Sequence, residues 1–235
     1  MKNIDVKGTI VSNDDKWIYD FFGYDATSPK MIADALEEAA GDDITFIINS
    51  GGGDVFAGNE INYLISQYRG NTQADIAGIA ASIATVICCA ADKVRMAAGA
   101  QYMIHNVSGS ASGDYHEMDK TSQVLINANR TISNTYRLKT GMSEKDLLKL
   151  MDSETWMDAV KAKEYGFVDE IIGDSNGTLD KPKNTLYNAC FVNIISDEVK
   201  EKVRNQIKNP MTSESSDILI QQNKIKLERM RGKLL

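Results

Sequence analysis

Short apolar runs alternate with helical patterns over residues 1–173 of the chain. Residues 44–48 are almost wholly apolar, which is typical of a strand that is covered on both faces. Residues 74–79 form a second run of this kind. Each run is followed by a helical pattern, at 54–68 and from about residue 82. Strands that alternate with helices indicate an α/β domain.

Capping residues predict four further helices. Each begins at a residue that is favoured as an N-cap, and the longest ends at a glycine, which is typical of a C-cap. These helices run from Ser28 to about Ala40, from Asp114 to Lys139, and onwards from Ser143 and Asp158. Short strands are predicted at 93–96, 101–105 and 167–172, and the pair Asp14-Asp15 is interpreted as a turn.

The turn-rich segment 173–184 (GDSNGTLDKPKN) is the strongest candidate for a domain boundary. We therefore divide the chain into a domain of residues 1–173 and a linker with a C-terminal extension, residues 174–235. Near its end the extension has apolar residues seven apart, at Ile220, Leu227 and Leu234. Two heptads are too few to predict a coiled coil.

Composition argues against several classes of function. A net charge of −7 and a pI near 5.0 do not suit a surface that neutralises phosphates, so we expect no nucleic-acid partner. The longest apolar stretch, residues 76–91, is short for a membrane span and contains polar residues, and the N-terminus shows no secretory signal. We therefore expect no membrane association.

Cysteine and histidine usage points to a cytoplasmic protein without a metal. The three cysteines form no C-x-x-C motif and no even set that would suggest disulfides, which is typical of a reducing compartment. The two histidines offer few ligands for a site of the His/Cys type. No metal or cofactor is predicted.

Three segments carry the residue types that acyl transfer requires: 48–53 (INSGGG), 78–84 (GIAASIA) and 102–106 (YMIHN). The reaction needs a nucleophile, a base that takes its proton, and hydrogen-bond donors for the developing oxyanion. Ser82 lies where a strand passes into a helix, and the free N–H groups of a helix start favour negative charge. His105 ends another strand. We consider Ser82 as the nucleophile and His105 as its base.

The N–H groups of Ile83 and Gly53 are the candidate oxyanion donors. Ile83 directly follows the serine, and a triple-glycine turn allows the backbone to approach a substrate closely, so Gly52 and Gly53 are also candidate substrate-binding residues. Each feature alone is weak, since a serine at a helix start is usually a cap. The glycines lack the spacing of a P-loop or dinucleotide site, and Ser82 lacks the G-x-S-x-G elbow of α/β-hydrolases.

In this combination and order, the segments resemble the proteolytic subunit of Clp protease, in particular the shorter head maturation proteases of tailed phages and prophages. The resemblance covers residues 44–172 and rests on NSGGG (49–53), AAS (80–82), MIH (103–105) and AKEYGFVD (162–169). It implies an α/β fold, the Clp protease/crotonase-like spiral. The predicted helix from Asp114 to Lys139 resembles the handle through which rings of subunits stack in pairs.

The chain departs from the family pattern at two points. The family's third catalytic residue is an aspartate two positions before an aromatic residue, and counting back from Trp156 gives Glu154. Asp152 is the alternative, or there is no acidic partner, while Asp158 is expected to cap a helix. The segment before Ile44 has no recognisable counterpart of the axial-pore hairpin used with unfoldases, which speaks against an ATP-driven partner.

The leading hypothesis is a self-assembling serine endopeptidase that acts on protein substrates in the bacterial cytoplasm. By resemblance, these would be capsid or scaffold proteins, cleaved in the cytoplasm or within the procapsid. The alternatives are a housekeeping ATP-dependent Clp proteolytic subunit, a catalytically inactive ring protein, and an acyl-CoA enzyme of the crotonase type. The last would leave the pair of Ser82 and His105 unexplained.

Overall fold

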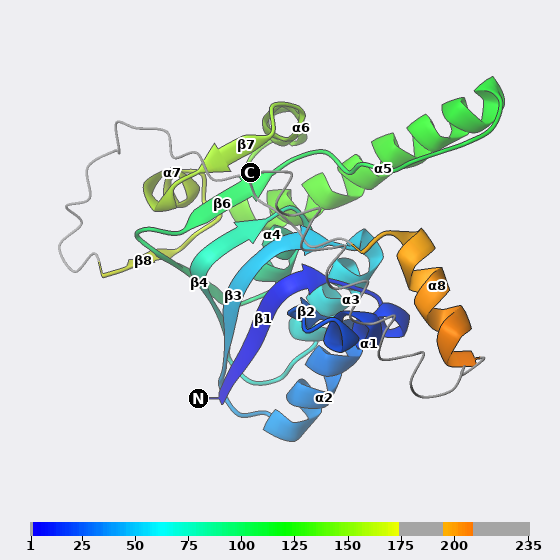
Figure 1. The fold of residues 1–235 in the computed structure, drawn as a ribbon. Coiled ribbons are helices and arrows are strands. Elements are labelled where there is room, and N and C mark those ends of the chain that lie inside the picture. The colour runs from blue at the N-terminus through cyan, green and yellow to red at the C-terminus, as the bar shows by residue number, and fades with distance from the viewer. Residues whose placement is uncertain (1, 174–194, 209–235) are drawn as a thin grey trace.

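A computed structural model describes residues 2–173 and 195–208 of the chain (Figure 1). The strands are β1 (Lys2–Ile10), β2 (Ala26–Thr27), β3 (Ile44–Gly53), β4 (Thr72–Ala81), β5 (Lys93–Ala97), β6 (Gln101–Ile104), β7 (Thr155–Met157) and β8 (Glu170–Ile172). The helices are α1 (Asn13–Phe21), α2 (Pro29–Ala39), α3 (Val55–Ser66), α4 (Ile83–Cys88), α5 (Tyr115–Thr140), α6 (Glu144–Asp152), α7 (Ala159–Glu164) and α8 (Asp197–Lys208).

The described strands form a single, mainly parallel sheet. Its order is β2-β1-β3-β4-β5-β8, with β6 beside β4 and β7 beside β6, and only the pair β6 and β7 is antiparallel. Parallel neighbours joined by helices are the arrangement of an α/β fold. The predicted fold class is confirmed.

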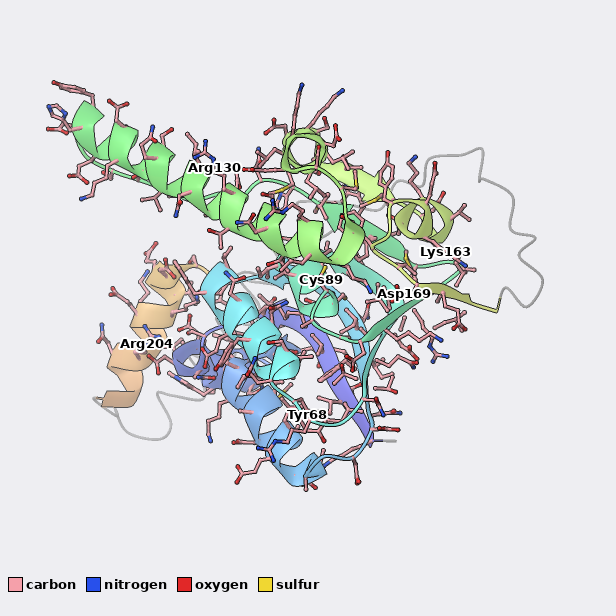
Figure 2. The ribbon with its side chains drawn as sticks, turned by 180° about the vertical axis from the view of Figure 1, so that it is seen from behind. Tyr68, Cys89, Arg130, Lys163, Asp169 and Arg204 are labelled. Atoms are coloured by element: carbon pink, nitrogen blue, oxygen red, sulfur yellow. The ribbon has the colours of Figure 1, made fainter. Side chains whose placement is uncertain are left out.

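Helices α2 and α3 pack against one face of the sheet, as the view from behind in Figure 2 shows. In β1 the buried residues Ile4 and Val6 alternate with the exposed Asn3 and Asp5, so the strand turns its apolar side toward the core and its polar side away. Ile32 of α2 and Ile61 and Ile65 of α3 are buried in the same core. The apolar pattern of the sequence thus reports which face of each element is covered.

Strand β4 has a different neighbour in each half. Its first half, Gln73–Ile76, pairs with β5, and its last residues, Ile79–Ala81, pair with β6. The division brings the ends of β4 and β6 to the same edge of the sheet. Because the chain continues from β4 into Ser82 and from β6 into His105, these two residues follow neighbouring strand ends.

Helix α5 projects from the body of the molecule as a long rod (Figure 1). Asp114 caps its start by accepting hydrogen bonds from two backbone N–H groups, and Gly141, with φ of 72°, ends it. Apolar side chains remain exposed along the rod, among them Tyr115, Met118 and Val124. Among the described residues, α5 is not apolar enough to cross a membrane, and neither is any other helix.

The N-terminal region contains more structure than the sequence predicted. The alternating residues of β1 were not assigned, and the turn predicted at Asp14-Asp15 is wrong because both residues lie in the first turn of α1. Asp15 is bound from the other end of the chain. Its carboxylate accepts hydrogen bonds from Lys200 (2.7 Å) and Arg204 (2.5 Å) of α8.

Helix α8 packs on α1. Arg204, which belongs to α8, is labelled in Figure 2. Ile195, just before α8, joins an apolar cluster with Val11, Ile18 and Tyr19, and its N–H donates to the Tyr19 hydroxyl. The predicted linker 174–184 and the heptad positions of 220–234 lie outside the described residues. The division into two domains therefore stays a prediction.

Candidate active site

Ser82 occupies a sharp, strained turn between β4 and α4. Its φ and ψ are 55° and −131°, in a region that residues with a side chain rarely adopt. The backbone N–H of Ser82 donates to the carbonyl of Met103 in β6 (2.9 Å), which ties the turn to the neighbouring strand. The sequence predicted this position at the start of a helix, and the structure confirms it.

His105 and Ser82 lie next to each other where the paired strands β6 and β4 end. The Nε2 atom of His105 lies 2.8 Å from Oγ of Ser82, which is hydrogen-bond distance. Ala81 pairs with Met103, so Ser82 follows beside Ile104, and His105 is the next residue of that strand end. The structure thus brings together the two residues that the sequence singled out as nucleophile and base.

Two buried hydroxyl groups, those of Thr85 and Tyr136, support the turn at Ser82 through hydrogen bonds. Thr85 Oγ1 lies 2.5 Å from the carbonyl oxygen of Ser82 and 2.6 Å from the hydroxyl of Tyr136 in α5. Because the single hydrogen of Thr85 goes to the carbonyl, the tyrosine is the donor in the second bond. Burial raises the pKa of Tyr136, so the phenol keeps the proton that it donates. Sequence reasoning missed this pair, whose members lie 51 residues apart.

Thr85→Val is expected to lower the free energy of unfolding by about 1–3 kcal/mol, because it leaves the buried Tyr136 hydroxyl without its acceptor. The Ser82 carbonyl loses one of its two donors and keeps the backbone N–H of Thr85. Denaturant unfolding would measure the change. Thr131→Val is the control, since Thr131 also donates to a backbone carbonyl but is exposed on α5. An equal effect of the two substitutions would contradict the supporting role of Thr85.

Two glycines bring the backbone of β3 against Ser82. Gly52 has φ of 100°, and a Cβ atom there would lie 2.7 Å from Cβ of Ser82. Gly53 has φ of 149°, and a Cβ atom there would lie 2.1 Å from the carbonyl oxygen of Ile10. Any side chain at either position would therefore collide with backbone or with the serine. The glycine segment thus lies close to Ser82 at Gly52 and close to β1 at Gly53, and its approach to a substrate stays a prediction.

Ile83 is the first residue of α4, and its side chain is buried against Gly58 of α3. The first N–H groups of a helix have no acceptor within the helix, so the N–H of Ile83 is placed to bind an anion beside Ser82. Gly53 is the last residue of β3, in the glycine segment. These are the two candidate oxyanion donors that the sequence indicated.

The two candidate acids, Asp152 and Glu154, shortly precede β7, the strand that pairs with β6. Their carboxylates bind groups other than His105. The ladder pairs Met103 with Trp156 and Ile104 with Thr155, so the next residues along the two strands are His105 and Glu154. The Glu154 carboxylate accepts from Nε1 of Trp156 at 3.3 Å.

Asp152 accepts from the amide of Asn106 at 2.8 Å, and the side-chain oxygen of Asn106 is buried without a partner. Among the described residues, neither Asp152 nor Glu154 is hydrogen-bonded to His105.

The other reactive side chains near the site are not arranged for catalysis. Burial raises the pKa of the Cys88 thiol well above its usual value and that of Cys89 to about 12, so both stay protonated at neutral pH. Cys89 Sγ faces the hydroxyl of Tyr102 at 3.9 Å, and its position near the end of α4 is labelled in Figure 2. The other histidine, His116, is exposed at the start of α5.

A family model described as Clp protease matches residues 25–175, the span that holds the candidate nucleophile, base, acids and oxyanion donors. The chain belongs to the Clp protease family. The family assignment drawn from the motifs is confirmed. The matched span begins after β1 and α1 and ends before α8, so the Clp protease model does not cover the contact between the two helices.

Individual relatives agree with the family assignment. The chain is 31% identical over 167 residues to the ATP-dependent Clp protease proteolytic subunit 1 of Chlamydia abortus, covering 66% of this chain and 86% of that protein. It is 30% identical over 138 residues to the ATP-dependent Clp protease proteolytic subunit of Streptococcus sanguinis, covering 57% and 70%.

A solved structure of a ClpP1 mutant from Listeria monocytogenes is similar to the chain, with a TM-score of 0.61 and 28% identity over 75% of this chain and 94% of that one.

Proposed function

We propose that the chain is a serine endopeptidase in which Ser82 is the nucleophile and His105 its general base. The observation that carries this proposal is the distance of 2.8 Å between His105 Nε2 and Ser82 Oγ, at the start of a helix and against a glycine segment. Membership of the Clp protease family supports it. Hydrolysis of a fluorogenic peptide by the purified protein, and its loss after treatment with a serine-directed phosphonate, would test it.

The geometry fits each step of the reaction. His105 takes the proton of Ser82 as its Oγ attacks the peptide carbonyl, and the carbonyl oxygen becomes an oxyanion between the N–H groups of Gly53 and Ile83. The tetrahedral intermediate collapses when His105 passes the proton to the leaving amine, which leaves an acyl-enzyme. Water then repeats the sequence with His105 as the base, and the acid product and free Ser82 are released.

Glu154 is our proposed acidic partner of His105. A partner at Nδ1 fixes the tautomer of the imidazole and stabilises the imidazolium that forms during attack. The pairing of β6 with β7 ends at Ile104 and Thr155, so His105 and Glu154 lie at the same end of this strand pair. Glu154 has φ of 45° and therefore lies outside the extended ladder. For this role the carboxylate must leave the indole of Trp156 and turn toward the histidine.

Glu154→Gln is expected to lower kcat by roughly 10⁴-fold, the loss typical of removing a triad carboxylate, while Asp152→Asn changes it by less than about tenfold. The measurement is steady-state peptide hydrolysis, after light scattering has shown that both variants assemble as the wild type does. A loss of less than about tenfold in Glu154→Gln would contradict the assignment. A larger loss in Asp152→Asn would then make Asp152 the acid, and small losses in both variants would mean that His105 has no acidic partner.

We further propose that the protein forms rings that stack in pairs through α5. The helix projects from the body and exposes Met118, Val124 and Ile126. Exposed apolar side chains are typical of a surface that another subunit covers. Multi-angle light scattering at micromolar concentration is expected to give a homo-oligomer. A monomer with full peptidase activity would contradict this prediction.

The biological role that we propose is cleavage of capsid or scaffold protein during phage or prophage head maturation, in the bacterial cytoplasm or the procapsid. The motif resemblance to the phage proteins supports it. The names of the relatives, ATP-dependent Clp protease proteolytic subunits, favour the second candidate, a housekeeping subunit that works with an unfoldase.

Incubation of the purified protein with the capsid and scaffold proteins encoded by the same phage or prophage would distinguish the two roles. Defined cleavage without ATP, absent from Ser82→Ala, is expected for a maturation protease. Degradation of a folded substrate only with ATP and a copurified ATPase would establish the housekeeping role instead.

A further inference from the structure

Ser50 lies in β3 at a point where both neighbouring strand pairings are interrupted. The register with β1 shifts between Lys7 and Thr9, and the register with β4 shifts between Ile48 and Ser50. Such irregularities leave backbone groups without their ladder partners, and these groups need other hydrogen bonds when they are buried. The side chain of Ser50, which is 1% exposed, supplies them.

The Ser50 hydroxyl joins β1 to the glycine segment. Its Oγ donates to the carbonyl of Gly8 at 2.6 Å and accepts from the N–H of Gly52 at 3.1 Å. A serine hydroxyl has one hydrogen, so the directions of both bonds are fixed: Gly8 accepts and Gly52 donates. The backbone of Gly52 is therefore held to β1 by the Ser50 side chain in addition to the ladder, in which Gly52 pairs with Thr9.

The peptide unit beyond Gly52 is the one that carries the N–H of Gly53. On its far side, the N–H of Asp54 donates to the carbonyl of Ile10 at 2.8 Å, so the segment is anchored to β1 both before and after this unit. Both glycines have positive φ, and a glycine changes its φ and ψ more easily than other residues when one of its hydrogen bonds is lost. Gly52 also lies in contact distance of Ser82, which relates the orientation of the segment to the nucleophile.

We propose that Ser50 is a positioning residue that aims the N–H of Gly53 at the oxyanion. The proposal rests on the proposed function, since it assigns a role within the same reaction. Without the Ser50 hydroxyl, substrate still binds, but the donor is no longer held in place when the oxyanion develops. The expected loss is therefore in kcat and in the affinity for transition-state analogues, with little change in KM.

The test compares Ser50→Ala with Thr27→Val. Thr27 is a matched control because its buried hydroxyl also bridges two backbone groups of β1, the N–H and the carbonyl of Lys7, both at 3.0 Å, but does not contact the glycine segment. Each substitution removes one buried bridging oxygen. Only Ser50→Ala removes the anchor of Gly52.

Ser50→Ala is expected to lower kcat by on the order of 10²-fold, as the loss of an oxyanion donor does, with KM within about twofold. The inhibition constant of a peptide boronate, whose tetrahedral adduct places an oxygen where the oxyanion forms, should rise by a similar factor. Thr27→Val should keep both quantities within about twofold of the wild type. A Ser50→Ala kcat within threefold of the wild type, or an equal loss in Thr27→Val, overturns the proposal.

Two other results of this comparison also bear on the role of Ser50. If Ser50→Ala does not assemble, the comparison uses Ser50→Cys, whose thiol is a weaker donor and acceptor, and a kcat within twofold of the wild type overturns the proposal. If the wild-type protein hydrolyses no peptide and no phosphonate labels Ser82, the proposed function and the role of Ser50 fall together. An active wild type with an equally active Ser50→Ala removes the role of Ser50 alone.

Discussion

Ser82→Ala is expected to lower kcat for peptide hydrolysis by on the order of 10⁶-fold, the loss found when a member of a triad that acts as a unit is removed. The substitution deletes the oxygen that lies 2.8 Å from His105 Nε2 and leaves the hydrogen bond from the Ser82 N–H to Met103 in place. Folding and assembly should therefore be unchanged.

The control is Ser133→Ala, which removes a buried hydroxyl on α5 that donates to the carbonyl of Arg130. Its kcat should stay within about twofold of the wild type. The measurement is initial rates on a fluorogenic peptide, with both variants purified free of host proteases. Near-wild-type activity of Ser82→Ala would rule out Ser82 as the nucleophile.

His105→Ala is expected to lose a similar factor in kcat and, in addition, the reaction of Ser82 with a phosphonate. Within residues 2–173 and 195–208, the histidine is the one group at hydrogen-bond distance from Ser82 Oγ to take its proton. Without it the hydroxyl stays protonated and is a weak nucleophile. The N–H groups of Gly53 and Ile83 are untouched, so a small residual rate over uncatalysed hydrolysis should remain.

His116→Ala is the matched control, since His116 is exposed at the start of α5. The rate of phosphonate labelling, followed by intact mass, should fall in His105→Ala and stay unchanged in His116→Ala. Labelling of His105→Ala at the wild-type rate would show that another group activates the serine.

The sequence predicts the residues of the site whose signals are local. The apolar run before Asn49, the glycines after it and the strand that leads into Ser82 are each visible within a few positions. The helices that begin at Ser28, Ser143 and Asp158 were predicted for the same reason, because their caps are read from neighbouring residues.

The parts that the sequence did not predict depend on contacts between distant positions. Thr85 and Tyr136 meet behind the nucleophile across 51 residues, and Asp15 meets Lys200 across 185. Nothing near any of these residues in the chain marks its partner. The role of Ser50 is similar, since its hydroxyl reaches back 42 residues to Gly8.

The choice of an acidic partner for His105 draws on both the sequence motif and the strand pairing. The motif gives Glu154 by counting from Trp156 and leaves Asp152 open. The antiparallel pairing of Tyr102, Met103 and Ile104 with β7 brings Glu154, the residue before β7, to the same end of the strand pair as His105. The side-chain bonds of the two acids are set by Trp156 and Asn106, which no local pattern predicts.

The most direct test of Ser82 as the nucleophile is to identify the residue that a phosphonate modifies. The purified protein is treated with a serine-directed diphenyl phosphonate, its intact mass is measured, and the modified peptide is sequenced by mass spectrometry. One adduct per subunit is expected on Ser82, absent from Ser82→Ala and formed much more slowly in His105→Ala. An unmodified wild type, or an adduct on a residue other than Ser82, would contradict it.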